Sequence, residues 1–141
     1  MTVSKTVIGE FSGHWHPGRT MSIETLIVDD QEDMRLLLRV FLGAQDDIVI
    51  TGEASNGIDA VDAYLDLRPA VIVLDEMMPK MRGLDVVRTL QDRGDEPRVV
   101  LCSAHLDTRV RAEASELGVD RCVSKNDMNG VVAAIRELAA Q

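Results

Sequence analysis

The sequence predicts an α/β domain in which helices cover both faces of a doubly wound sheet of five parallel strands. Short runs of Val, Ile and Leu alternate with stretches in which apolar residues recur at helical spacing. Five such strand–helix units follow one another between residues 22 and 141. The apolar runs are continuous, which is typical of parallel strands that helices bury on both sides.

Each predicted strand is a short apolar run that a polar or charged residue ends. The five runs lie at 24–29, 48–51, 70–75, 98–102 and 119–123. The first ends at Asp29 and Asp30 and the third at Asp75. The fourth stops at the hydroxyl of Ser103, and Lys125 follows the fifth. Functional side chains are therefore expected at the carboxyl ends of at least four strands.

A helix is predicted after each strand, on the basis of apolar spacing and of residues that cap or end helices. The ranges are 33–43, from a turn at 55–57 to residue 67, 84–93, 107–117, and a last helix capped by Asn126 or Asp127. Gly43 and Gly118 stand where helices stop, Pro69 ends the second helix, and Asp107 can cap the fourth. The predicted inward residues are, helix by helix, Met34, Leu37, Leu38, Phe41 and Leu42; Ile58, Val61 and Leu65; Leu84, Val87 and Leu90; Val110, Ala114 and Leu117; and Val131, Ile135 and Leu138.

Composition and charge indicate a cytoplasmic protein with one acidic domain. The net charge is −9, and the first 21 residues carry Lys5, Glu10 and Arg19, so residues 22–141 carry −10. Such a body argues against direct nucleic-acid binding, which needs clustered Lys and Arg. No apolar stretch is long enough to span a membrane. Cys102 and Cys122 lie inside apolar runs and are expected to be reduced core residues.

Residues 1–21 differ in composition from the rest of the chain. They show no lasting period and are rich in Gly, Ser and His, and they lack the apolar core of a secretory signal. Two histidines in the stretch HWHP at 14–17 are too few ligands for a metal site. We therefore expect an N-terminal extension at 1–21, disordered or appended, and a functional domain at 22–141.

The polar residues at the strand ends are suited to a divalent metal and a phosphoryl group. Parallel strands bring their carboxyl ends to one edge of the sheet, beside the point where strand order reverses. Asp29, Asp30 and Asp75 would supply the carboxylate oxygens that Mg²⁺ prefers. A carboxylate can also act as a nucleophile toward phosphorus. Ser103 would add a hydroxyl donor and Lys125 a positive charge on the phosphorylated side.

The sequence motifs resemble those of the response-regulator receiver domain, a family of two-component signalling, over about residues 22–141. The acidic pair Asp29-Asp30 follows the first strand, and residues 74–83 read LDEMMPKMRG, as in the family pattern L-D-x-x-M-P-x-M-x-G. Ser103 followed by Ala104, and then Lys125, complete the pattern. The resemblance implies a flavodoxin-like sheet with strand order 2-1-3-4-5.

The resemblance also implies a role for each matching residue. Asp75 would accept a phosphoryl group from a histidine kinase or a phosphotransfer protein. Asp30 and Asp75 would bind Mg²⁺ directly, Asp29 mainly through water, and the main-chain carbonyl of Met77 would be a further ligand.

On the phosphoryl side, the resemblance implies that Ser103 is the hydroxyl of the switch and that Lys125 contacts the acyl phosphate. The small Ala104 would leave the site open. Side chains such as Glu76 and His105 lie near places that tune the lifetime of the acyl phosphate in the family, and His105 is expected to be a solvated loop residue.

Two positions depart from the family pattern. Cys122 stands where receivers usually carry an aromatic residue of the switch, and small-residue packing is a better interpretation of it than a redox role. Asn126 stands where a proline with a cis peptide bond is common. Because a cis bond before a residue other than proline costs about 2.5–4 kcal/mol, a trans bond is expected here.

The sequence therefore predicts a signalling switch and not an enzyme. Phosphorylation would change the surface formed by residues 107–138, which would then bind a downstream protein or a second copy of the chain. Two alternatives are a Mg²⁺-dependent phosphohydrolase with Asp29 or Asp30 as nucleophile, and a receiver-like binding domain that works without phosphate.

Overall fold

The computed structural model describes residues 22–141 of the chain. The predicted N-terminal extension at 1–21, with its two histidines of the HWHP stretch, lies outside the described residues.

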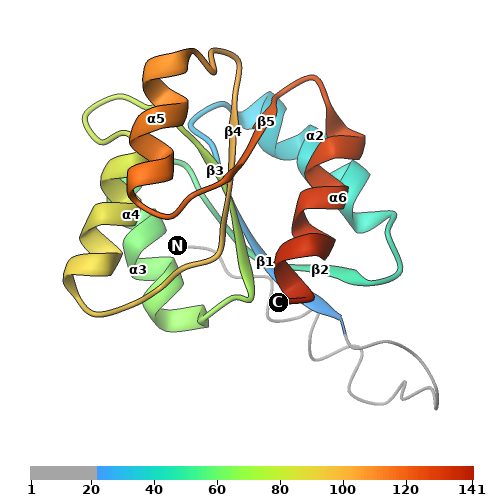
Figure 1. The fold of residues 1–141 in the computed structure, drawn as a ribbon. Coiled ribbons are helices and arrows are strands. Elements are labelled where there is room, and N and C mark those ends of the chain that lie inside the picture. The colour runs from blue at the N-terminus through green and yellow to red at the C-terminus, as the bar shows by residue number, and fades with distance from the viewer. Residues whose placement is uncertain (1–21) are drawn as a thin grey trace.

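Five parallel strands form one sheet in the order β2-β1-β3-β4-β5, as predicted. The strands are β1 (Ile23–Val28), β2 (Ile48–Ala54), β3 (Val71–Asp75), β4 (Val99–Ser103) and β5 (Arg121–Ser124). All of them run in the same direction, so their carboxyl ends meet at the upper edge of the sheet in Figure 1. The strand order reverses between β1 and β3, which places these two strands at the centre of that edge.

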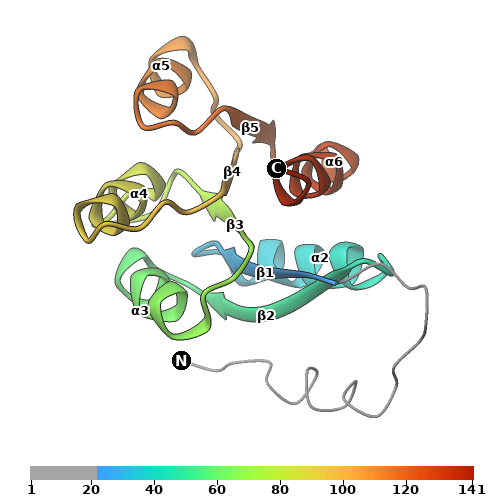
Figure 2. The same ribbon diagram turned by 60° about the horizontal axis from the view of Figure 1, so that its bottom comes forward.

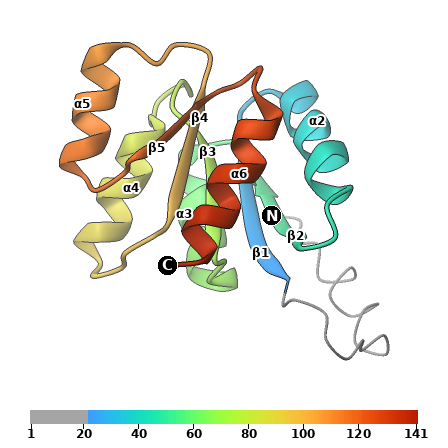
Figure 3. The same cartoon turned by 45° about the vertical axis from the view of Figure 1, so that its right-hand side comes forward.

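Five helices cover the two faces of the sheet. They are α2 (Glu32–Gly43), α3 (Gly57–Leu67), α4 (Gly83–Asp92), α5 (Thr108–Glu116) and α6 (Met128–Ala139). Figures 2 and 3 show α2 and α6 on one face and α3, α4 and α5 on the other. Each face has its own cluster of buried aliphatic side chains packed against the strands. The doubly wound architecture predicted from the sequence is therefore confirmed. No helix within residues 22–141 has the length and apolar character needed to cross a membrane.

The strand boundaries differ most from the prediction in β2 and β5. β2 continues to Ala54 instead of ending at residue 51, because the register with β1 shifts at one point. Ile50 pairs with Thr25 and Gly52 with Leu26, so Thr51 is an extra residue in a bulge. β5 begins at Arg121, two residues later than predicted, and the amide of Val119 donates to the carbonyl of Ala114 in α5 at 2.8 Å.

The predicted inner faces are correct for most helices, but two side chains were placed wrongly. Leu37 is 47% exposed, because α2 turns Met34, Leu38 and Leu42 toward the sheet at a spacing of four residues. Ile58 is 69% exposed, because the buried side of α3 is formed by small residues and Tyr64.

Several helix ends are fixed by residues that were predicted from the sequence to cap or end helices. The side chain of Asp107 accepts a hydrogen bond from the amide of Val110 at the start of α5. Asp127, one of the two predicted candidates, caps α6 in the same way through the amide of Gly130. Gly118 follows α5 with a φ of +81°, a conformation that favours glycine. Among residues 22–141 all peptide bonds are trans, so the bond before Asn126 is trans as predicted.

Gly83 lets α4 begin directly beneath the end of β3. A Cβ atom at this position would lie 2.3 Å from the carbonyl oxygen of Asp75. The amide of Gly83 also donates to the carbonyl of Glu76, with an N–O distance of 3.1 Å. The absence of a side chain therefore sets the position of the loop that carries Asp75.

We expect Gly83→Ala to lower the free energy of unfolding by about 2 kcal/mol, because the added methyl group overlaps main-chain atoms that cannot move aside. Urea denaturation measures the change. Gly43→Ala is the matched control, since a Cβ there meets nothing within 4 Å and helix propensity predicts a gain of up to about 1 kcal/mol. Equal effects of the two substitutions would contradict the prediction.

Candidate functional site

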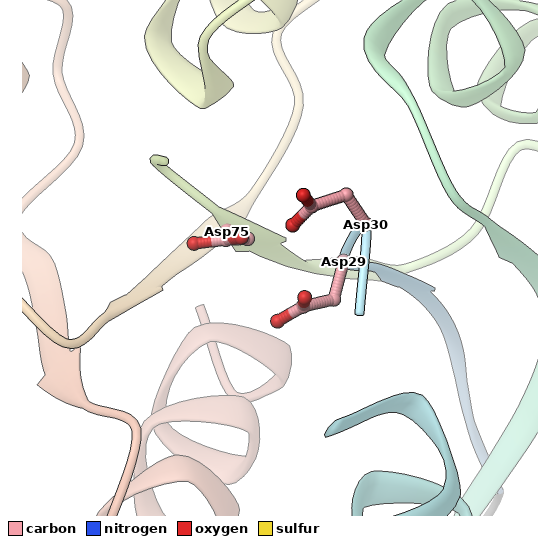
Figure 4. Close-up of side chains that lie close together, drawn as sticks. All are labelled: Asp29, Asp30 and Asp75. Atoms are coloured by element: carbon pink, nitrogen blue, oxygen red, sulfur yellow. The ribbon is translucent and has the colours of Figure 1, made fainter. Parts of the chain in front are cut away.

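Three aspartates from β1 and β3 lie together at the centre of the carboxyl edge of the sheet. Asp29 and Asp30 follow the last residue of β1, and Asp75 is the last residue of β3. One carboxylate oxygen from each lies within 4.8 Å of the corresponding oxygens of the other two. Figure 4 shows the three side chains converging on one region. Asp29 and Asp75 are buried, whereas Asp30 is exposed to solvent.

Lys125 places its ammonium group between the two buried carboxylates. Its Nζ atom lies 2.9 Å from Oδ2 of Asp29 and 3.2 Å from Oδ2 of Asp75. The lysine follows β5, and its amide donates to the carbonyl of Ser103 at the end of β4. Burial alone lowers the pKa of Lys125, but its bonds to the two aspartates outweigh that effect and raise the pKa. The lysine therefore stays protonated.

Asp75 has an unusually basic carboxylate. Burial, and then the negative charge of Asp29, raise its pKa to about 6. The charge of Lys125 and the hydrogen bond from the amide of Met77 to Oδ1, at 3.1 Å, act in the opposite direction without cancelling the rise. A nearby cation would stabilise a carboxylate in such surroundings.

Oδ2 of Asp75 contacts Lys125 but accepts no hydrogen bond. Among the buried side-chain nitrogen and oxygen atoms of residues 22–141, it is the one that accepts no hydrogen bond. Its contact with Lys125 is an ion pair at 3.2 Å whose geometry is not that of a hydrogen bond. An orphaned buried oxygen beside two further carboxylates fits a hard divalent cation such as Mg²⁺.

Ser103 and Ala104 lie at the end of β4, next to β3. Ser103 is buried, and its hydroxyl oxygen accepts a hydrogen bond from the amide of His105 at 3.2 Å. Ala104 and His105 are exposed. The hydroxyl of Ser103 therefore has a donor but keeps its own proton for another acceptor.

Two side chains near the site have contacts that the sequence did not reveal. Arg35 of α2 donates from Nη1 to the carbonyl oxygen of Asp29 at 2.8 Å, which holds the turn after β1. Glu76 is fully buried, and its Oε1 accepts from the amide of Leu84 at 3.0 Å while its Oε2 pairs with Arg82. These contacts direct the Glu76 side chain toward Arg82 and the start of α4.

Cys122 lies in β5 opposite Leu101 of β4 and packs against the core cluster beneath α5. The thiol is half-buried and free, and burial raises its pKa. Because a protonated thiol is a poor nucleophile, these observations favour packing over redox chemistry at this position.

The sequence matches the response regulator receiver domain family over residues 25–136. The chemotaxis protein CheY of Thermotoga maritima is 30% identical over 120 residues, which cover 84% of this chain and 99% of that protein. A protein-glutamate methylesterase/protein-glutamine glutaminase of Methanosarcina mazei is 37% identical over 114 residues. The transcriptional regulatory protein BtsR of Escherichia coli K12 is 42% identical over 90 residues. The matches cover 77% and 64% of this chain but only 32% and 37% of those two longer proteins.

Solved structures of receiver domains share the fold. The response regulator domain of Thermotoga maritima CheB superposes with a TM-score of 0.80 at 24% identity, covering 85% of this chain and 98% of that one. CheY in a CheX–CheY–BeF₃–Mg²⁺ complex of Borrelia burgdorferi gives a TM-score of 0.76 at 22% identity, covering 84% and 90% of the two chains. Identities this low support the fold alone.

We expect Asp75 to titrate near pH 6 in the metal-free protein. In the unfolded chain an aspartate titrates near ~3.9, so the folded state binds the proton more tightly between these two values. Lowering the pH from 7 to 4 should therefore raise the free energy of unfolding of the wild type, relative to Asp75→Asn, by about 2 kcal/mol. Urea denaturation of both proteins with a chelator present, at several pH values, measures this difference. A difference that stays constant over the range would contradict the raised pKa.

Proposed function

The chain belongs to the response regulator receiver domain family, and we propose that it is a phosphorylation-dependent signalling switch with Asp75 as the phosphoacceptor. The observation that carries this proposal is the state of Asp75: a buried carboxylate with one unbonded oxygen, a raised pKa and a lysine ammonium 3.2 Å away. The donor would be a phosphohistidine of a histidine kinase or of a phosphotransfer protein.

The transfer itself forms one bond and breaks another. An oxygen of the Asp75 carboxylate forms a bond to phosphorus while the bond from phosphorus to the donor's leaving group breaks. The leaving group keeps the electron pair and takes up a proton from solvent. Lys125 would turn from the carboxylate it now pairs with to an oxygen of the phosphoryl group, which carries the negative charge after transfer. The Ser103 hydroxyl, with its proton uncommitted, would donate to another phosphoryl oxygen.

Asp29, Asp30 and Asp75 would hold Mg²⁺, with the main-chain carbonyl of Met77 as a further ligand. The proximity of the three carboxylates and the orphaned oxygen of Asp75 support this assignment. The ion would offset negative charge on the phosphoryl oxygens during transfer. Asp30 is exposed and can bind the ion at little cost, whereas Asp29 already holds Lys125 and fits a role through water.

The output of the switch would be a change in protein contacts and not in catalysis by this domain. The acyl phosphate should alter the surface formed by residues 107–138, which includes α5, β5 and most of α6, for a downstream protein or a second copy of the chain. A cytoplasmic setting suits the two unpaired thiols of Cys102 and Cys122.

We expect wild-type protein incubated with acetyl phosphate and Mg²⁺ to gain the mass of one phosphoryl group, because the carboxylate of Asp75 is the available nucleophile. Asp75→Asn should gain none. Intact-mass spectrometry measures both.

The same experiment separates the alternatives. A mass increment in both proteins would place the phosphoryl group on another residue and contradict the assignment of Asp75. Steady release of phosphate from several phosphate esters, without an adduct, would support a phosphohydrolase. Neither adduct nor Mg²⁺ binding would support a binding domain that works without phosphate.

We expect Asp30→Asn to weaken Mg²⁺ binding at least about tenfold, because the substitution replaces a charged ligand by a neutral one. Thermal stability should stay unchanged, because Asp30 is exposed. Isothermal titration calorimetry measures the affinity. Asp33→Asn is the matched control, since it removes a charge in the first turn of α2 from an exposed residue outside the cluster. Equal weakening by both substitutions would indicate general electrostatics and not a ligand.

A further inference from the structure

The residue after the proposed phosphoacceptor is itself a buried carboxylate. Glu76 is 1% exposed and shares a peptide bond with Asp75, but its side chain bonds to Arg82 and to the start of α4. Its Oε1 accepts from the amide of Leu84 at the start of α4, and its Oε2 accepts from Nε of Arg82 at 2.6 Å. A buried charge held in this way cannot leave its partners without a large cost. A displacement of the Asp75 main chain would therefore move Arg82 as well.

Arg82 uses the other side of its guanidinium group to hold α5. Nη1 and Nη2 donate to the two carboxylate oxygens of Glu113 at 3.1 and 2.9 Å. Arg88, one and a half turns further along α4, also pairs with Glu113 and with Asp85. Arg82 and Arg88 together lower the pKa of Glu113 to about 2, so this carboxylate stays charged. A continuous chain of ionic contacts thus joins the loop after Asp75 to the middle of α5.

The apolar attachment of α5 is weak. Ala114 is the one residue of this helix that is fully buried, and Val110 and Leu117 are only partly buried against the core. Within residues 22–141, side chains of α4 bond to α5 and its C-cap at two places: the arginines at Glu113, and Gln91, which donates to the carbonyl of Leu117 at 2.7 Å. The contact with Gln91 lies at the C-terminal end of the helix. The ionic contact at Glu113 therefore determines the position of the rest of α5 relative to α4.

We propose that Glu76, Arg82 and Glu113 transmit the phosphorylation state of Asp75 to α5. The inference rests on the proposed function and adds to it the route by which the site reaches the surface. The contact between Glu76 and Arg82 stays fixed, because the carboxylate of Glu76 is buried. The contact between Arg82 and Glu113 can shift, because Arg82 is 41% exposed and Glu113 is 22% exposed. α5 then has two arrangements, which differ in the contact between Arg82 and Glu113.

Hydrogen exchange of α5 amides in the free protein and in protein loaded with beryllium fluoride and Mg²⁺ tests the proposal. In the wild type, we expect the exchange rate of residues 108–117 to differ between the two states by about fivefold or more. In Glu113→Gln the difference should fall below about twofold. A purely structural role of the pair would change exchange in both states alike and leave the difference intact.

Asp47→Asn is the matched control. Asp47 holds Arg136 of α6 through two hydrogen bonds, at 2.8 and 2.9 Å, in a contact between elements that does not reach α5. This variant should keep the wild-type response of α5. Arg82→Lys is the second test variant, because a lysine still compensates the buried charge of Glu76 and supports folding but cannot form the forked contact with Glu113. It should lose the response as Glu113→Gln does.

Intact mass after acetyl phosphate treatment is measured on each protein in parallel. An adduct on Glu113→Gln and Arg82→Lys together with a wild-type exchange response of α5 would overturn this inference and leave the proposed function standing. A wild type that forms the adduct but shows no exchange response in α5 would also overturn it. A wild type that forms no adduct would overturn both.

Discussion

The ammonium group of Lys125 lies between two buried carboxylates that would otherwise repel each other at the centre of the sheet edge. Asp29 comes from β1, Asp75 from β3 and the lysine from the end of β5, so their contacts form only when the whole sheet has been assembled. Burial of Asp75, and then the negative charge of Asp29, raise the pKa of Asp75, because the one ammonium group does not compensate both carboxylates. A further cation would reduce the repulsion between the two carboxylates. The raised pKa also makes the Asp75 carboxylate more basic, so the proposed binding of Mg²⁺ and the proposed nucleophilic role would rest on the same electrostatics.

Two consecutive acidic residues at the end of β3 contact different parts of the domain. Asp75 lies beside Asp29 and Lys125, whereas Glu76 accepts from the amide of Leu84 near the start of α4. Gly83 makes this arrangement possible, because a Cβ atom at this position would lie 2.3 Å from the carbonyl oxygen of Asp75. The loop between Asp75 and Gly83 is therefore short and fixed at both ends. It has little freedom to absorb a displacement that follows a covalent change at Asp75.

The sequence was sufficient to predict the sheet order, the layers and the aspartates, lysine and serine of the site. The strand order followed from the resemblance of the motifs to a family. The layers and the site residues depend on local patterns, since a continuous apolar run that ends in a charge predicts both a parallel strand and the place where its functional residue lies. The bulge at Thr51 and the exposure of Ile58 could not be predicted, because they depend on how neighbouring elements compete for the same space. The contact between Arg82 and Glu113 was missed for a related reason. Its partners are separated by 31 residues, and charged residues on helices usually face solvent.

Cys122 lies where receivers usually have an aromatic side chain. Its thiol is too small to transmit a conformational change through the core by displacing neighbouring side chains. A charge network acts differently from packing. The contact at the buried Glu76 is shielded from salt, whereas the contact at Glu113, which is 22% exposed and pairs with the 41% exposed Arg82, is accessible to solvent and screening. Moving α5 would then require rearranging the ion pairs of Glu113 with Arg82 and Arg88, because Ala114 is the one fully buried residue of the helix and Val110 and Leu117 are only partly buried. Such a helix can shift at low cost, and a buried carboxylate next to the proposed phosphoacceptor would supply the rigid connection that makes the shift depend on Asp75.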